Sequence, residues 1–149
     1  MEEEKRRTCP RATGFVESDG ERIYHEVCGE GEPVVLCHGA GGNHASWYQQ
    51  VPAFASRYRV ITWDQRGFGR STNRADRSGP RAAVADLRGL LDHLAVDKAH
   101  LVGQSMGGWV ILGFALAHPE RVRSLVFAST TAGIQVPGMA RIGIFESIR

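Results

Sequence analysis

The chain has 149 residues, of which 42% are hydrophobic and 23% are charged, and its formal net charge at pH 7 is only +2. This balance is typical of a soluble globular domain with one hydrophobic core. The small, scattered charge argues against a nucleic-acid or anionic-membrane surface. The charged N-terminus precedes no apolar run, so we expect no secretory signal, and no apolar stretch approaches the ~20 residues of a membrane span.

The three cysteines, Cys9, Cys28 and Cys37, form neither a C-x-x-C pair nor a metal-ligand spacing. An odd number of cysteines without a signal peptide favours reduced thiols. We therefore expect a cytoplasmic protein without a metal site. Cys37 stands in an apolar run and is expected to be a small core residue.

The first half of the chain predicts two pairs of strands. Two short alternating segments, residues 14–17 and 22–27, flank an Asp-Gly pair and predict an antiparallel hairpin. The continuous apolar run at 34–37 predicts a strand that is buried on both faces. A helical stretch follows near residues 44–58, where Pro52 predicts a kink or two short helices.

A further strand is predicted at 59–63, and a polar surface loop at 71–79. Proline at position 80 suits the first turn of a helix. The apolar residues behind it recur at helical spacing and predict an amphipathic helix. They are Val84, Leu87, Leu91 and Leu94.

The second half continues the alternation of strands and helices. A strand is predicted at 98–102, and a helix at 105–118 is apolar on nearly every side and so should be buried. Pro119 ends that helix, and a last strand follows at 122–128. This order predicts an α/β fold whose parallel sheet has helices on both faces.

Residues 103–107 read Gly-Gln-Ser-Met-Gly, which is the pattern G-x-S-x-G between a predicted strand and a predicted helix. Glycine on either side lets the backbone turn tightly at Ser105, at a strain of about 1–3 kcal/mol. The turn would project the hydroxyl from the carboxyl edge of the sheet, in front of a helix N-terminus. Ser105 is therefore the candidate nucleophile.

A glycine-rich segment, His-Gly-Ala-Gly-Gly-Asn at residues 38–43, follows the buried strand. Acyl transfer needs two backbone N–H donors for the developing oxyanion. We expect one from Met106, which follows the serine, and the other from Ala40, because glycines permit close approach. A phosphate-binding loop is the rival interpretation, but the spacing matches neither G-x-G-x-x-G nor a P-loop.

Together these motifs resemble the α/β-hydrolase superfamily, and its esterase, enol-lactonase and carbon–carbon-bond hydrolase groups in particular. The resemblance covers roughly residues 14–130 and keeps the family order of motifs. It implies the sheet order 1-2-4-3-5-6 with the second strand antiparallel. Relatives that open epoxides use an aspartate as nucleophile, so Ser105 implies an acyl-enzyme route instead. The matching segments are 34–39, Trp47, 63–71, 103–108 and 117–122.

The resemblance also implies supporting roles for the residues around the nucleophile. His38 and Gly39 would brace the oxyanion segment, and Asp64 and Arg66 would brace the loop after the fourth strand. The residues that shape the turn at the serine would be Gly103, Gln104 and Gly107.

The mechanism also needs a histidine base and an acid, which the family places after the serine. His118 is the only histidine after Ser105, and about 13 residues of helix at about 1.5 Å each would put it ~20 Å away. The acids after the serine are Glu120 and Glu146, and neither has a histidine to orient. We therefore expect the catalytic acid and base to lie outside this chain.

On this basis residues 1–12 are a flexible lead-in, 13–130 the N-terminal half of a hydrolase core, and 131–149 the start of a lid. The leading hypothesis is a hydrolase of small carboxylic esters or lactones, without cofactor. The alternative is a non-catalytic remnant that acts as a binding or interaction module. It would self-associate, or pair with the missing half, at the exposed apolar edge strand 122–128. A third hypothesis is weak autonomous esterase activity that uses His38 or His44.

Overall fold

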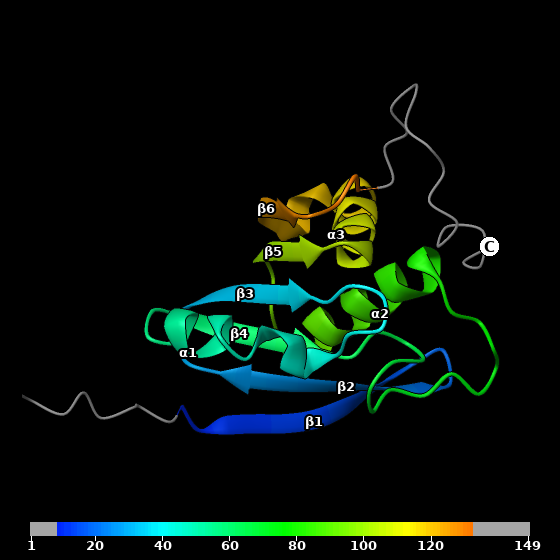
Figure 1. Ribbon diagram of the computed structural model, residues 1–149, viewed down its shortest axis with the longest axis horizontal. Helices are drawn as coiled ribbons and strands as arrows, with labels where there is room; N and C mark the ends of the chain where they lie inside the picture. Colours follow the sequence, from blue (N-terminus) through cyan, green and yellow to red (C-terminus); the bar gives the residue numbers. More distant parts are fainter. Residues whose placement is uncertain (1–8, 133–149) are drawn as a thin grey trace, which may run out of the picture.

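The computed structural model describes residues 9–132, which form a six-stranded sheet of order β1-β2-β4-β3-β5-β6. Figure 1 shows the strands in this order, from β1 at the bottom to β6 at the top. Only β2 runs antiparallel to its neighbours. The predicted fold class and strand order are confirmed. The strands are β1 (Arg11–Ser18), β2 (Glu21–Cys28), β3 (Glu32–Cys37), β4 (Tyr58–Trp63), β5 (Ala99–Gln104) and β6 (Val122–Ala128).

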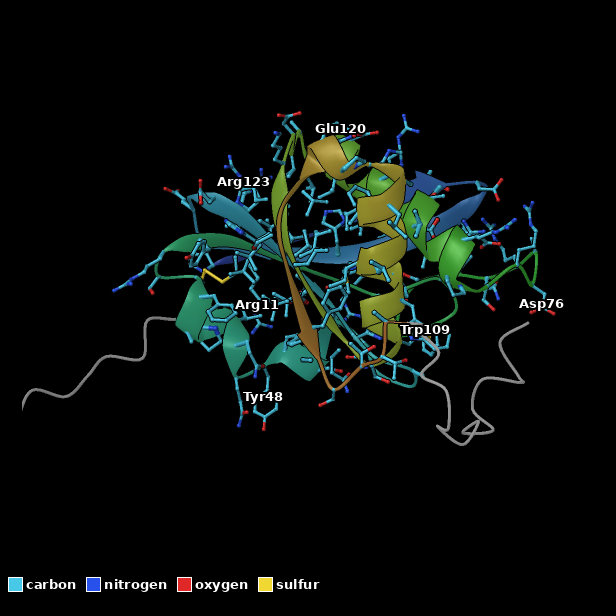
Figure 2. The ribbon with its side chains drawn as sticks, turned by 90° about the horizontal axis from the view of Figure 1, so that it is seen from above. Arg11, Tyr48, Asp76, Trp109, Glu120 and Arg123 are labelled. Atoms are coloured by element: carbon cyan, nitrogen blue, oxygen red, sulfur yellow. A yellow bond between two sulfur atoms is a disulfide. The ribbon has the colours of Figure 1, made fainter. Side chains whose placement is uncertain are left out.

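The helices lie on both faces of the sheet (Figure 2). α2 (Pro80–His93) and α3 (Met106–Ala117) cover one face, while η1 (His44–Trp47) and α1 (Gln50–Phe54) cover the other. A short turn of 3-10 helix, η2 (Pro119–Arg121), leads into the last strand. The stretch predicted near 44–58 is thus divided into two short helices, and its proline lies in the first turn of α1, where a missing N–H costs little.

Strand β3 connects the two cores because successive side chains of a strand point to opposite faces. Val35 and Cys37 join the larger core beneath α2 and α3, whereas Val34 and Leu36 join the smaller core with Trp47. All four strand residues are at most 5% exposed. The prediction of a strand buried on both faces is therefore confirmed.

Two of the three cysteines are not reduced, which corrects the sequence-based expectation. A disulfide joins Cys9, just before β1, to Cys28 at the end of β2. The hairpin register explains the pairing, since Arg11 lies opposite Cys28. The cytoplasmic location was expected because reduced thiols were expected, and the disulfide removes that reason. Cys37 is free and fully buried, as expected, and burial raises the pKa of its thiol to about 12.

Strand β6 lies at the edge of the sheet and pairs only with β5 among the described residues. Val126 and Phe127 on it are 50% and 43% exposed, and Leu116 of α3 is 77% exposed. The edge is therefore apolar and open in residues 9–132, as expected. No helix in this range has the length and apolar character that crossing a membrane requires.

The structure does not test the predicted domain boundaries. β1 begins at Arg11, three residues before the strand that was predicted at 14–17. Residues 1–8 and 133–149 lie outside the described part of the chain. The expected lid segment falls almost wholly within the second of these ranges.

Candidate active site

Ser105 makes the turn between β5 and α3 by itself, because the strand ends at Gln104 and the helix begins at Met106. Its backbone has φ 51° and ψ −117°, a conformation that residues with a side chain rarely adopt. A strained backbone of this kind persists only where the surrounding structure holds it. Ser105 is half-buried, and it precedes the first residue of α3, so it lies neither in the core nor in the helix interior.

Glycine at positions 103 and 107 is a steric requirement of this turn. A Cβ atom on Gly103 would lie 2.5 Å from the carbonyl oxygen of Gly107. A Cβ atom on Gly107 would overlap the Cys37 carbonyl group and lie 2.8 Å from the His38 oxygen. The helix therefore starts directly against the end of β3, which brings the serine beside the segment that follows β3.

Hydrogen bonds to the end of β6, to the first turn of α3 and to the residues after β6 hold both backbone polar groups of Ser105. Its N–H donates to the Ala128 carbonyl oxygen at 3.0 Å, and its own carbonyl oxygen accepts from the Gly108 N–H at 2.9 Å. The Thr130 hydroxyl donates to that same carbonyl oxygen at 2.6 Å. Sequence reasoning missed Thr130. The available signal was its place after a strand parallel to β5.

The glycine-rich segment 38–43 lies against the serine. A Cβ atom on Gly39 would lie 3.1 Å from the Ser105 Cβ and 2.5 Å from the Gln104 Oε1. Within residues 9–132, neither the Ala40 N–H nor the Met106 N–H donates a hydrogen bond. Ala40 is exposed and Met106 is half-buried. The site thus combines one hydroxyl with two backbone donors that have no partner in the described part of the chain.

The fully buried His38 ring holds this segment in place. Its Nδ1–H donates to the Gly39 carbonyl oxygen at 2.7 Å, and its Nε2 accepts from the Gln65 N–H at 3.0 Å. The Gln65 side chain also donates to the His38 carbonyl oxygen at 2.6 Å. Burial lowers the pKa of His38, which favours the neutral ring that these partners require. With both nitrogens engaged, His38 has no free nitrogen for the serine.

The Asp64 carboxylate, which is fully buried, connects the same segment to the loop after β4. It accepts from the His44 N–H at 2.6 Å, the His44 Nδ1 at 2.8 Å and the Arg70 N–H at 2.8 Å. The other ring nitrogen of His44 lies 3.4 Å from a Glu26 carboxylate oxygen. His44 opens a short helix, as expected, but its ring lies between two carboxylates. Neither histidine of the weak-esterase hypothesis is hydrogen-bonded to Ser105.

Arg66 anchors the loop after β4 to helix α2. Arg66 is only 3% exposed, and its guanidinium group donates two hydrogen bonds, of 3.0 and 2.7 Å, to the carboxylate of Asp86. Sequence reasoning missed Asp86. The signal was present, because Asp86 lies among Ala83, Leu87 and Leu90 on the buried face of the predicted helix and so needed a buried partner.

No general base accompanies Ser105 in the described part of the chain, where its hydroxyl has no hydrogen bond to a histidine. His118 follows the last residue of α3, and the serine precedes the first. Figure 2 shows Trp109, in the first turn of α3, and Glu120, just past His118, at opposite ends of the helix. Within residues 9–132, no group of three or more His, Cys, Asp or Glu residues is arranged to hold a metal ion.

Comparison with known proteins gives the same fold. The model of the α/β-hydrolase fold family matches residues 32–142. A relative that is 42% identical over 120 residues is the 2-hydroxy-6-oxononadienedioate/2-hydroxy-6-oxononatrienedioate hydrolase of Paraburkholderia phymatum. The match covers 75% of this chain and 41% of that protein.

Solved structures are similar over the same region. Est816, described as an N-acyl homoserine lactone degrading enzyme, is 38% identical with a TM-score of 0.76, over 78% of this chain and 45% of that one. The epoxide hydrolase CorEH is 29% identical with a TM-score of 0.81, over 88% of this chain and 46% of that one. The chain spans about two fifths of the length of the curated relatives that it matches, 40% and 41% for the first two.

Proposed function

The chain belongs to the α/β-hydrolase family, and from this premise we propose that it is part of a hydrolase that cleaves small carboxylic esters or lactones with Ser105 as nucleophile. One observation carries the proposal. Ser105 has a strained backbone at a strand-to-helix turn, and Gly39 of the glycine-rich segment lies against it. The similarity to a lactone-degrading enzyme and to a hydrolase of dienedioates supports the same class of reaction.

In the proposed reaction the Ser105 hydroxyl attacks the carbonyl carbon of the substrate. The carbonyl oxygen becomes an oxyanion that accepts hydrogen bonds from the Met106 and Ala40 amides. The alcohol leaves, an acyl-serine remains, and water then releases the acid. A histidine oriented by an acid must take the serine proton, and we assign both to residues outside this chain, whose six histidines all lie within 9–132. The chemistry needs no metal or organic cofactor.

Similarity to an epoxide hydrolase does not extend the proposal to epoxides. That similarity of 29% identity concerns the shared fold. Opening an epoxide by the route of this family requires a carboxylate nucleophile, whereas position 105 carries a hydroxyl. An acyl-enzyme is the intermediate that a serine at this turn can form.

The competing proposal is a non-catalytic module, and one observation favours it, namely that no described histidine reaches the serine. The two proposals differ in whether an activated ester acylates Ser105 in preference to other serines. If the amides stabilise the oxyanion, p-nitrophenyl acetate should acetylate Ser105, and the acetyl group should accumulate because no base activates water for its removal.

Intact-mass analysis with peptide mapping measures this acetylation. We expect one acetyl group at Ser105, its loss in Ser105→Ala, and no change in Ser78→Ala, which removes an exposed serine of the loop before α2. Acetylation of Ser105 no faster than that of other exposed serines would contradict the proposed role of the two amides and favour the binding module, whereas a folded chain that takes no acetyl group at any serine is what a serine without its base gives.

A further inference from the structure

Thr130 lies over the Ser105 turn although 25 residues separate the two in sequence. Strands β5 and β6 are parallel, and Gln104 lies opposite Ala128, so both strands end at the same edge of the sheet. Ser129 has a φ of 49°, which turns the chain back toward the helix. A Cβ atom on Gly108 would overlap the Thr130 side chain, which shows how closely the threonine covers the first turn of α3.

The hydroxyl of Thr130 has defined donor and acceptor roles. It accepts a hydrogen bond from the Ala132 N–H at 3.0 Å, so its hydrogen is free to be donated. It donates that hydrogen to the Ser105 carbonyl oxygen at 2.6 Å. A hydroxyl that accepts one hydrogen bond donates a second more strongly, because the two polarise each other.

The Ser105 carbonyl and the Met106 N–H belong to the same planar peptide group and point in opposite directions. The Gly108 N–H and the Thr130 hydroxyl both donate to this carbonyl oxygen, and by fixing it they also fix the direction of the Met106 N–H. The same hydrogen bonds draw electron density toward the oxygen and make the N–H a better donor. The amide of Ala40 is held in the same way, because the Gly39 carbonyl oxygen of its peptide group accepts hydrogen bonds from the His38 Nδ1–H at 2.7 Å and from the Gly42 N–H at 3.1 Å.

We propose that Thr130 is a positioning residue, whose hydroxyl sets the direction and the donor strength of the Met106 amide through the peptide group between Ser105 and Met106. The catalytic meaning of this contact rests on the proposed function, in which that amide binds the oxyanion. The positioning itself can be measured without any hydrolysis.

Labelling the full chain with [15N]methionine tests the positioning directly. Of the three methionines, Met1 carries the amino terminus, so Met106 and Met139 are the expected amide signals. We expect the Met106 nitrogen resonance to move upfield in Thr130→Val and to stay near its original position in Thr130→Ser. Thr131→Val is the matched control, because the Thr131 hydroxyl forms no hydrogen bond within residues 9–132.

A Ser105→Cys variant tests the effect of the same contact on an anion at the turn. A thiolate at a helix N-terminus is stabilised by the amides there, and it needs no histidine to react. We expect the pKa of this thiol, taken from the pH profile of iodoacetamide alkylation, to rise when Thr130→Val is added. Because the lost hydrogen bond acts on the thiolate only through the peptide group, we expect the reaction near pH 7 to slow by at most about five-fold, the equivalent of one whole hydrogen bond. Peptide mapping separates this thiol from the buried Cys37.

Each result decides between the two claims. A Met106 resonance and an alkylation profile that respond to Thr130→Val no more than to Thr131→Val would overturn the role of Thr130 and leave the proposed function standing. A thiol at position 105 that does not react in the Thr130 parent would overturn the proposed function, and the catalytic meaning of Thr130 with it. If Thr130→Val does not fold, the comparison of Thr130→Ala with Thr130→Ser replaces it.

Discussion

Replacing Gly107 by alanine adds one methyl group where helix α3 meets the end of β3. Alanine is favoured over glycine in a helix by up to about 1 kcal/mol, so the helix itself gains stability. The methyl group would, however, overlap the Cys37 carbonyl, with the His38 oxygen at 2.8 Å. Overpacking costs about 1–3 kcal/mol, and the upper value applies where the crowding atoms are backbone. We expect a net loss of about 2 kcal/mol in the free energy of unfolding.

Gly89→Ala is the matched control for this variant. Gly89 lies in α2, and a Cβ atom there would approach nothing closer than the Ser18 side chain at 3.8 Å. It should therefore gain up to about 1 kcal/mol, which places the two variants about 3 kcal/mol apart. Urea unfolding followed by circular dichroism measures both. Equal stability of the two variants would refute the claim that the backbone of α3 starts in contact with β3.

Three further predictions concern buried groups away from the turn. Asp86→Asn should lower the free energy of unfolding by about 3 kcal/mol, because it leaves the Arg66 charge without its buried partner. The control Asp92→Asn, which changes an exposed carboxylate, should alter that free energy by less than about 1 kcal/mol. Urea unfolding measures both variants. Burial lowers the pKa of His25, so the unfolded chain binds more protons below about pH 6.5 and stability should fall as the pH drops from about 8 to about 5. Urea unfolding across that range should show a smaller decline for His25→Gln, and an unchanged decline would exclude His25 as its source. The Cys37 thiol, whose pKa burial raises to about 12, should resist iodoacetamide near pH 8 until the chain unfolds, and mass spectrometry would reveal any earlier labelling.

Local sequence patterns were sufficient to predict the strands, the helices and the turn at the serine, whereas the strand order 1-2-4-3-5-6 was implied by the family resemblance. The strand at 34–37 carries its own signal, because four successive apolar residues suit a strand with a helix layer on each side. The tight turn at Ser105 was predicted from the glycines that flank it, and a Cβ atom on Gly103 or Gly107 would indeed overlap backbone atoms. These features depend on neighbours in the sequence, which is why short patterns predict them.

Contacts between distant segments were the part that the sequence did not disclose. The Cys9–Cys28 disulfide depends on the hairpin register, which starts three residues earlier than predicted. The hydrogen bond from Thr130 to Ser105 depends on where the chain turns after β6. Neither position carries a periodic pattern, and each becomes meaningful only when the sheet order places two strand ends side by side.

The most direct test of the account is the site selectivity of a fluorophosphonate probe on the folded chain, read by peptide mapping over the exposed serines. A backbone amide aimed at the developing oxyanion is worth about 10²–10³ in rate in serine hydrolases. Ser105 should therefore be phosphonylated well ahead of the exposed Ser56 and Ser78, and the selectivity should disappear in Ser105→Ala. Labelling of Ser105 no faster than of Ser56 or Ser78 would contradict the account, because the amides of Met106 and Ala40 would then not act on an oxyanion at this turn.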